Sequence, residues 1–266
     1  MLRPTQPYSG CGEGQSSRHR IIRHQSPIGR WEAVNRRPDS RLAEVVDGEY
    51  QGWVEHEVSF SRRREIPAAI VPMILNLVAA FRIHGPSQHR GVGAVFDSFV
   101  AGLHESFRLV EALGPAACLQ ANLTPLGAYL VFGVSMAGLT NRCVALDDLL
   151  GKDAGRLVER LHDARGWERR FEILDAFLLG RLAAQRPTSA GLIWAWRRLE
   201  ETGGRVLIHS LAEGICCSHK HMIAQFREQI GLPPKMLGRI FRFQSVAGVL
   251  ERGEDHRWVE VAHDRG

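Results

Sequence analysis

Residues 211–235 read LAEGICCSHKHMIAQFREQIGLPPK, and this stretch decides how the rest of the chain is interpreted. Ser218 precedes a helical period at the position of an N-cap, where its hydroxyl can accept a hydrogen bond from a free amide of the first turn. Met222 and Phe226 are four residues apart and therefore share one face of that helix. Gly231, two residues before a pair of prolines, ends it. The stretch predicts two short helices joined by a tight turn.

The same spacing also fits a small helical hairpin with no binding role, so the residues around it matter. From Leu211 to Val246 the chain resembles the AraC/XylS family of bacterial transcription regulators. The residues that carry this resemblance are Leu211, Ala212, Ser218, Met222, Phe226, Arg227, Gly231, Pro234, Arg242 and Val246. Three positions depart from the family: Cys216 replaces the usual turn glycine, Leu237 stands where tyrosine is common, and Ala224 stands where arginine is frequent.

The resemblance implies a helix-turn-helix whose second helix lies in the major groove of double-stranded promoter DNA. The DNA-binding residues expected at this helix are Ser218, His219, Lys220, His221, Ile223, Ala224 and Arg227. By position, Lys220, Ile223 and Ala224 face the bases. His221 and Arg227 support the helix or contact phosphate.

Residues 31–149 have a different pattern. Residues 50–58 alternate apolar and polar side chains, which indicates a half-buried strand, whereas residues 62–65 are read as a charged turn. Several short strands separated by turns predict a small barrel or sandwich. This half resembles the cupin-like sensor domains of the family through residues 98–103 (SFVAGL) and 123–128 (LTPLGA). The expected fold class is therefore α+β, with a strand-rich, cupin-like sensor domain followed by an all-α helix-turn-helix domain.

The remaining boundaries follow from composition and period. Residues 1–30 lack an apolar period and are expected to form a disordered leader. Residues 150–184 show an amphipathic helical period, and this helical segment either dimerises or packs on its own sensor domain. Residues 188–266 form the AraC-type domain. Its last nine residues, 258–266, resemble the opening of a second helix-turn-helix whose recognition helix is missing, so we expect that segment to fray and DNA binding to be weak.

Composition limits the class of protein. The 266 residues carry a net charge of +5, which permits a polyanionic partner without requiring one. Five cysteines, an odd number without regular spacing, favour a reducing compartment over a disulfide framework. The apolar run at 66–81 is interrupted by Pro67 and Pro72 and is shorter than a membrane span. We therefore expect a cytoplasmic protein with no membrane partner.

No pattern in the chain predicts catalysis, so we expect no enzyme, no catalytic residue, no cofactor and no metal. The histidines at 56, 84, 89 and 104 show neither an HxH pair nor HExxH spacing. Cys216 and Cys217 are adjacent, which is unfavourable for binding one tetrahedral zinc ion. The sequence GVSMAG at 133–138 lacks the spacing of a nucleophile elbow.

The sequence therefore predicts a sequence-specific DNA-binding transcription regulator of the AraC/XylS type, controlled by an unknown ligand or partner. A homodimer and a small-molecule effector are the further partners that the resemblance allows. The alternative is a truncated sensor or interaction module that no longer binds promoters itself and acts through dimerisation.

Overall fold

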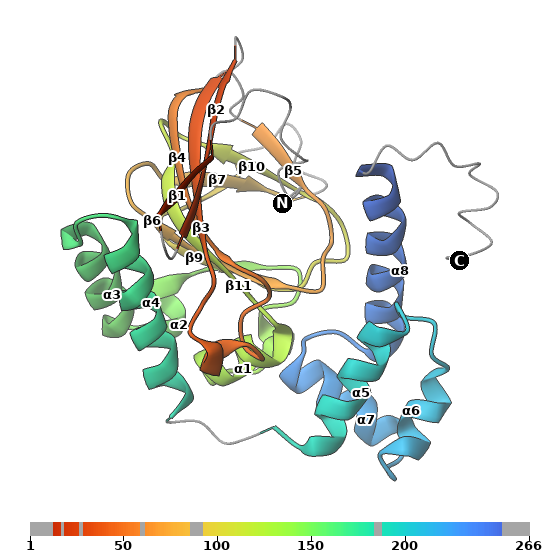
Figure 1. Cartoon of the computed structure of the whole chain (residues 1–266). Coiled ribbons are helices and arrows are strands. Elements are labelled where there is room, and N and C mark those ends of the chain that lie inside the picture. Colours follow the sequence, from red (N-terminus) through yellow and green to blue (C-terminus); the bar gives the residue numbers. More distant parts are fainter. Residues whose placement is uncertain are drawn as a thin grey trace.

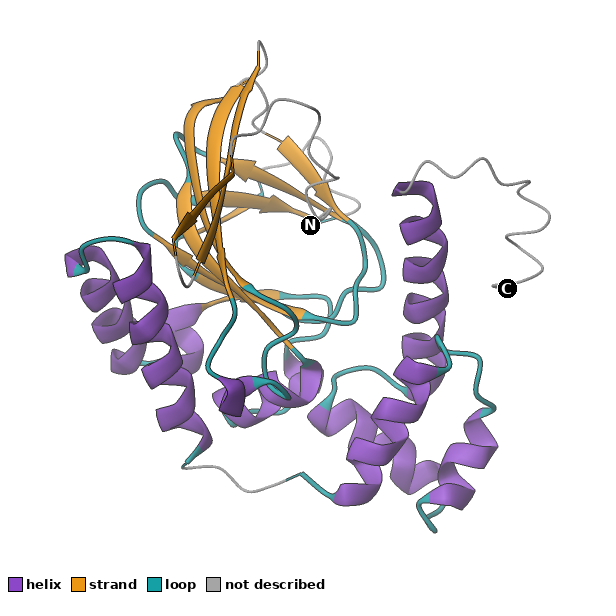
Figure 2. Cartoon of the chain, in the orientation of Figure 1, coloured by secondary structure: helices purple, strands orange, loops and turns teal. Residues whose placement is uncertain are grey.

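The computed structural model describes residues 13–16, 19–26, 29–58, 62–85, 93–183 and 188–251. Strands fill the N-terminal part as far as residue 145, and helices dominate from there on (Figures 1 and 2). The chain is thus an α+β protein with a strand-rich part followed by a helical part. The expected coarse fold class is confirmed; a cupin identity for the strand-rich part stays a prediction.

The described strands form two antiparallel sheets. An eight-stranded sheet has the order β1-β2-β3-β4-β11-β6-β9-β12, and a four-stranded sheet has the order β5-β10-β7-β8. Their bounds are β1 Glu13–Ser16, β2 His19–Ser26, β3 Gly29–Arg36, β4 Tyr50–Val58, β5 Arg62–Glu65, β6 Val71–Asn76, β7 Phe81–His84, β8 Ala94–Phe96, β9 Phe99–Ala101, β10 Arg108–Ala112, β11 Ala117–Leu123 and β12 Cys143–Ala145. Figure 1 shows the two sheets facing each other.

The central strands are buried on both faces, and the two faces pack into different clusters. In β6, Val71, Met73 and Leu75 belong to the large core on the helical side. Ile74, which points to the opposite face, belongs to the smaller cluster between the sheets. This is the side-chain period of two expected for a strand. Neighbouring β11 repeats the pattern, with Leu119 in the large core and Cys118 between the sheets.

Helices cover the outer face of the large sheet. Those that precede the C-terminal part are α1 Pro125–Phe132, α2 Leu146–Leu150, α3 Lys152–Asp163 and α4 Trp167–Leu182, with the 3-10 turns η1 Ser40–Leu42 and η2 Met136–Gly138. α1 begins at an N-cap, because the Thr124 hydroxyl accepts from the amide of Gly127 at 3.0 Å. It ends at Gly133, whose φ of 67° is a left-handed conformation that suits glycine. In α4, Phe171, Leu174 and Leu178 are buried in the large core, so this helix packs on its own chain.

The helical part continues with α5 Ala190–Glu201, α6 Ile208–Gly214, α7 His219–Gln229 and α8 Pro234–Glu251. α5 begins at Ser189, whose hydroxyl accepts from the amide of Leu192. Leu192, Leu199, Leu211 and Phe226 join the same core cluster as the large sheet. The predicted second unit at 258–266 lies outside the described residues.

Two expectations about the strand-rich part are wrong. Residues 13–16, 19–26 and 29–30, expected to belong to a disordered leader, lie in β1, β2 and β3; residues 1–12, 17–18 and 27–28 are outside the described residues. The strands pair over their length, Arg23 donates to Glu32 at 2.8 Å, and the ring of His24 stacks on Trp31 at 5.1 Å. These cross-strand contacts stabilise the pair of strands, although no apolar period in the sequence predicts it.

Residues 62–65, expected to be a turn, form strand β5. Two charges of this segment are compensated by carboxylates on other strands. Arg62 lies 3.7 Å from Glu111 on the paired strand β10, and Arg63 pairs with Glu55 of β4 in the facing sheet. A charged run can therefore form an edge strand when its neighbours carry the opposite charge.

Candidate functional site

The expected site residues lie on α7 and on the turn before it. α6 and α7 are joined by four residues, 215–218, and the Ser218 hydroxyl accepts from the amide of His221 at 3.2 Å. This N-cap fixes the first residue of α7 and satisfies one of its free amides. Cys216, in the turn, has a φ of 50°, a left-handed conformation that is unfavourable for a residue with a side chain.

One face of α7 holds it against the core. Met222 and Phe226 are fully buried, as are Leu211 of α6 and Ile230 after α7. Their spacing along α7 matches one helical face. Burial of this face determines which side of α7 remains free.

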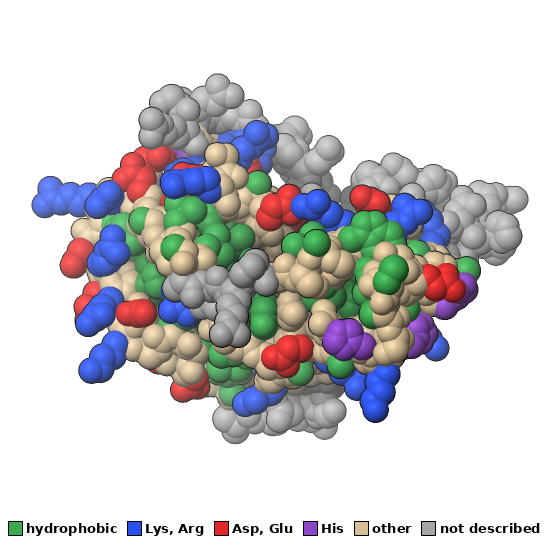
Figure 3. Space-filling view, turned by 90° about the horizontal axis from the view of Figure 1, so that it is seen from below, with side chains coloured by type: hydrophobic (Ala, Val, Ile, Leu, Met, Phe, Trp, Pro, Cys, Tyr) green, Lys and Arg blue, Asp and Glu red, His purple; other side chains and the backbone are tan. Residues whose placement is uncertain are grey.

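The opposite face of α7 is open to solvent. Ser218, His219, Lys220, His221, Ala224 and Arg227 are exposed, and Ile223 is half-buried. The His221 ring lies 3.0 Å from the Gln225 side-chain amide, which orients it along the helix. Figure 3 shows histidine and basic side chains gathered at the end of the molecule formed by the C-terminal helices. The structure therefore brings the seven predicted residues together on α7 and its N-cap residue, and their binding to DNA stays a prediction.

The C-terminal end of α7 is attached to the strand-rich part. The Ser135 hydroxyl donates to Glu228 at 2.6 Å, and the Thr140 hydroxyl donates to the Gly231 carbonyl at 2.7 Å. The Arg242 guanidinium of α8 donates to the Gly204 carbonyl at 2.7 Å, which ties α8 to the turn between α5 and α6. α7 is thus held at its C-terminal end while its N-terminal half projects outward.

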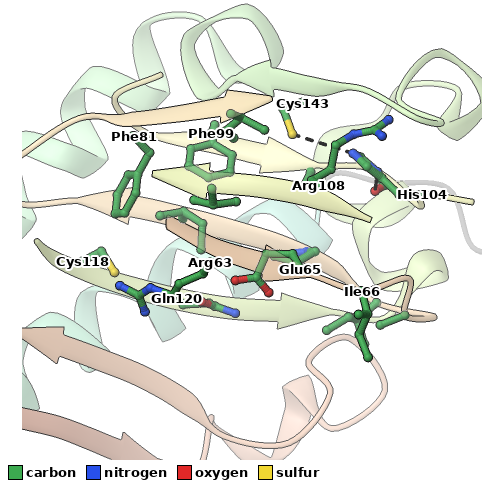
Figure 4. Close-up of a pocket in the computed structure, with 18 of the residues that line it drawn as sticks. Arg63, Glu65, Ile66, Phe81, Phe99, His104, Arg108, Cys118, Gln120 and Cys143 are labelled. Atoms are coloured by element: carbon green, nitrogen blue, oxygen red, sulfur yellow. Dashed lines mark hydrogen bonds between the residues drawn. The ribbon is translucent and has the colours of Figure 1, made fainter. Parts of the chain in front are cut away.

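A second feature, which sequence reasoning missed, is a cavity between the two sheets. Its volume is about 130 Å³. Side chains from β4, β5, β6, β7, β9, β10, β11 and β12 line it, together with segment 66–70 that joins β5 to β6. Figure 4 shows Phe81 and Phe99 at one end and Arg108, His104 and Cys143 at the other. The alternation in the strands signalled an interior face, but no sequence pattern showed where that face is incompletely filled.

The polar groups of the cavity are held in definite states. His104 Nδ1 lies 2.6 Å from the Gly102 carbonyl, so this nitrogen carries the proton and donates. Burial, with a smaller contribution from nearby Arg108, lowers the pKa of His104 to about 4, so the ring is neutral at pH 7. Its Nε2 lies 3.9 Å from Cys143 Sγ, and burial raises the pKa of that thiol to about 11. The pair is therefore neutral and is not an activated nucleophile.

The histidines that could have served as metal ligands do not lie together. His84 contacts Glu111, His104 lines the cavity, His56 is exposed, and His89 lies outside the described residues. In the part of the chain that the structure describes, no group of three or more His, Cys, Asp or Glu side chains is arranged to hold a metal ion. The same residues contain no helix that is both long and apolar enough to cross a membrane.

The similarity to known proteins is one of structure rather than of sequence. No protein-family model matches the chain, and no curated protein matches it. Among solved structures, the AraC-like transcriptional activator CuxR is similar over 87% of this chain and 87% of its own, with 14% sequence identity and a TM-score of 0.33.

Proposed function

We propose that this protein is a DNA-binding transcription regulator that inserts α7 into the major groove of a promoter. The observation that supports the proposal is the exposed N-terminal half of α7, which a buried apolar face and an N-cap hold in place. In helix-turn-helix proteins the N-terminal residues of the second helix contact base edges while the preceding helix crosses the backbone. The N-terminal residues of α7 are exposed to solvent, as such base contacts require.

The proposal assigns roles by position on α7. Lys220 and Ala224 are exposed and one helical turn apart, so they face the same groove together with half-buried Ile223. Ala224 contributes at most an apolar contact, such as one to a thymine methyl group. His221 and Arg227 are assigned to phosphate contacts or to support of the helix, in agreement with the hydrogen bond between His221 and Gln225.

Selection from a random pool of DNA duplexes, using the purified 266-residue chain, tests this function. An enriched sequence motif at near-physiological salt supports a sequence-reading α7. Binding without enrichment would reduce the protein to a nonspecific binder, and absence of binding even at low salt would overturn the proposal.

The substitution Lys220→Ala tests the assigned surface. Loss of one phosphate-neutralising or base-contacting cation is expected to weaken binding to the selected site and, for a phosphate contact, to reduce the salt slope by about one. Lys152→Ala, on the exposed start of α3, is the matched control. Equal affinity and equal salt slope for the chain carrying Lys220→Ala would remove Lys220 from the interface.

A further inference from the structure

The turn between α6 and α7 contains a cysteine at a position that favours glycine. The amide of Cys217 donates to the Ala212 carbonyl at 3.1 Å, and the amide of Cys216 donates to the Glu213 carbonyl at 3.0 Å. These two hydrogen bonds form a Schellman motif at the end of α6, in which the residue held here by Cys216 is left-handed and usually glycine. Cys216 has a φ of 50°. Strain of this kind is concentrated at functional sites, so the thiol at this position calls for a functional explanation.

A second thiol follows the first. Cys216 is exposed, Cys217 is half-buried, and both are free cysteines. Their α-carbons are about 3.8 Å apart, as in any two residues joined by a trans peptide bond. The other described cysteines, Cys118 of β11 and Cys143 of β12, lie on strands that two further strands of the large sheet separate. Among the described residues, only Cys216 and Cys217 can therefore bind one atom through two sulfurs.

The thiol of Cys217 can move without opening α7. Its Sγ donates to the Ser218 carbonyl at 3.5 Å, a long contact to a weak donor. The same carbonyl accepts from the amide of Met222 at 3.0 Å, and the Ser218 hydroxyl accepts from the amide of His221. Both of these hydrogen bonds remain when the thiol turns away. Binding of a ligand by the two sulfurs is thus compatible with the folded chain.

Adjacency of the two sulfurs limits what they can bind. A disulfide is disfavoured, because disulfides usually join α-carbons about 4.4–6.8 Å apart. Zinc needs four ligands, and among the described residues no third His, Cys, Asp or Glu side chain completes a metal-binding group. A metal ion with two sulfurs in a straight line needs them on opposite sides, and adjacent residues hold their sulfurs too close for this. Trivalent arsenic with one carbon substituent fits the pair, because it is thiophilic and pyramidal and needs only two sulfurs.

We propose that Cys216 and Cys217 form a vicinal dithiol site that binds a monosubstituted trivalent arsenical. In the reaction of R–As=O with the pair, two As–S bonds form and the As–O double bond breaks. The oxygen leaves as water together with the two thiol protons. Arsenic stays trivalent and the sulfurs are not oxidised, so no oxidant or reductant is needed. The inference goes beyond the proposed function and does not depend on it.

Mass spectrometry of the whole folded chain tests this site. The chain is incubated with one equivalent of phenylarsine oxide and then with excess glutathione, a monothiol that competes for arsenic. The second sulfur of the pair binds intramolecularly, so we expect one phenylarsenic group to remain and two titratable thiols to be lost. Cys216→Gly and Cys217→Ser each leave a single sulfur, and the affinity measured against glutathione should fall about 100-fold or more.

Cys216→Gly is the more informative variant, because glycine suits the left-handed position and the turn is expected to remain folded. Cys143→Ser, which removes a cysteine from the strand-rich part, is the control and should retain the group as the wild type does. Peptide mapping should place the group on the peptide that contains both adjacent cysteines. A chain that retains no group after glutathione treatment, equal retention by Cys216→Gly, or a group mapped to another cysteine would overturn the inference.

Discussion

Acidification should destabilise the folded chain through one buried histidine. The pKa of His104 falls from its ordinary value of 6.5 to about 4 in the folded protein, chiefly because the ring is removed from water. Between these two values the unfolded chain binds more protons than the folded chain does. The free energy of unfolding therefore decreases as the pH falls from 6.5 towards 4.

The size of this effect follows from the two pKa values. The full loss, reached at or below pH 4, is about 3 kcal/mol, because each unit of difference corresponds to about 1.4 kcal/mol. At pH 5, where acid unfolding by carboxylates is less advanced, the same relation gives about 2 kcal/mol. Either loss is a substantial fraction of the free energy of unfolding of a typical domain.

Urea unfolding followed by tryptophan fluorescence at pH 7 and pH 5 measures this loss. The variant His104→Asn keeps a donor for the Gly102 carbonyl but cannot be protonated, and other titrating groups contribute equally to both proteins. We expect the wild-type chain to lose about 2 kcal/mol more than the variant between the two pH values. His209→Asn, at an exposed histidine, is the control and should behave as wild type. Equal losses for the wild type and His104→Asn would refute the argument.

Two further substitutions test the packing and the turn that present α7. Phe226→Ala removes a fully buried ring and should lower the free energy of unfolding by about 3–5 kcal/mol, measured by urea unfolding, whereas an effect below about 1 kcal/mol would show that this face is not packed as described. Cys216→Gly relieves a left-handed residue with φ of 50° and should raise stability by about 1 kcal/mol in the same assay, with Cys217→Ala in the same turn as the comparison. Destabilisation by Cys216→Gly would contradict the left-handed turn.

The helical part was predictable because its signals are local. Ser218 caps α7, and Met222 and Phe226 lie one turn apart, so each feature is contained within about a dozen residues. The structure places α7 at His219–Gln229, where these signals predict a helix. Caps and helical periods determine structure through neighbours in the sequence, and they are therefore visible in it.

The strand-rich part was less predictable because its stabilising contacts join distant residues. β2 pairs with β3 through rings and charges rather than an apolar period, and the charges of β5 are compensated on other strands. The cavity likewise depends on contacts between residues that are far apart in the sequence. One end of it depends on Arg108 lying beside Asn141, and on His104 lying beside Cys143, 39 residues away in the sequence. No local pattern marks contacts between residues so far apart.

The two parts of the chain are connected more closely than a linker between separate domains implies. One continuous core contains Leu75 of the large sheet, Phe171 of α4 and Phe226 of α7, so packing extends without interruption from the sheet to the exposed helix. The amide of Ala69, in the segment that lines the cavity, donates to Gln244 of α8 at 3.3 Å. A displacement of segment 66–70 would therefore act first on α8, which follows α7 after only four residues. Such coupling requires no hinge, because contacts with the strand-rich part already set the orientation of α7.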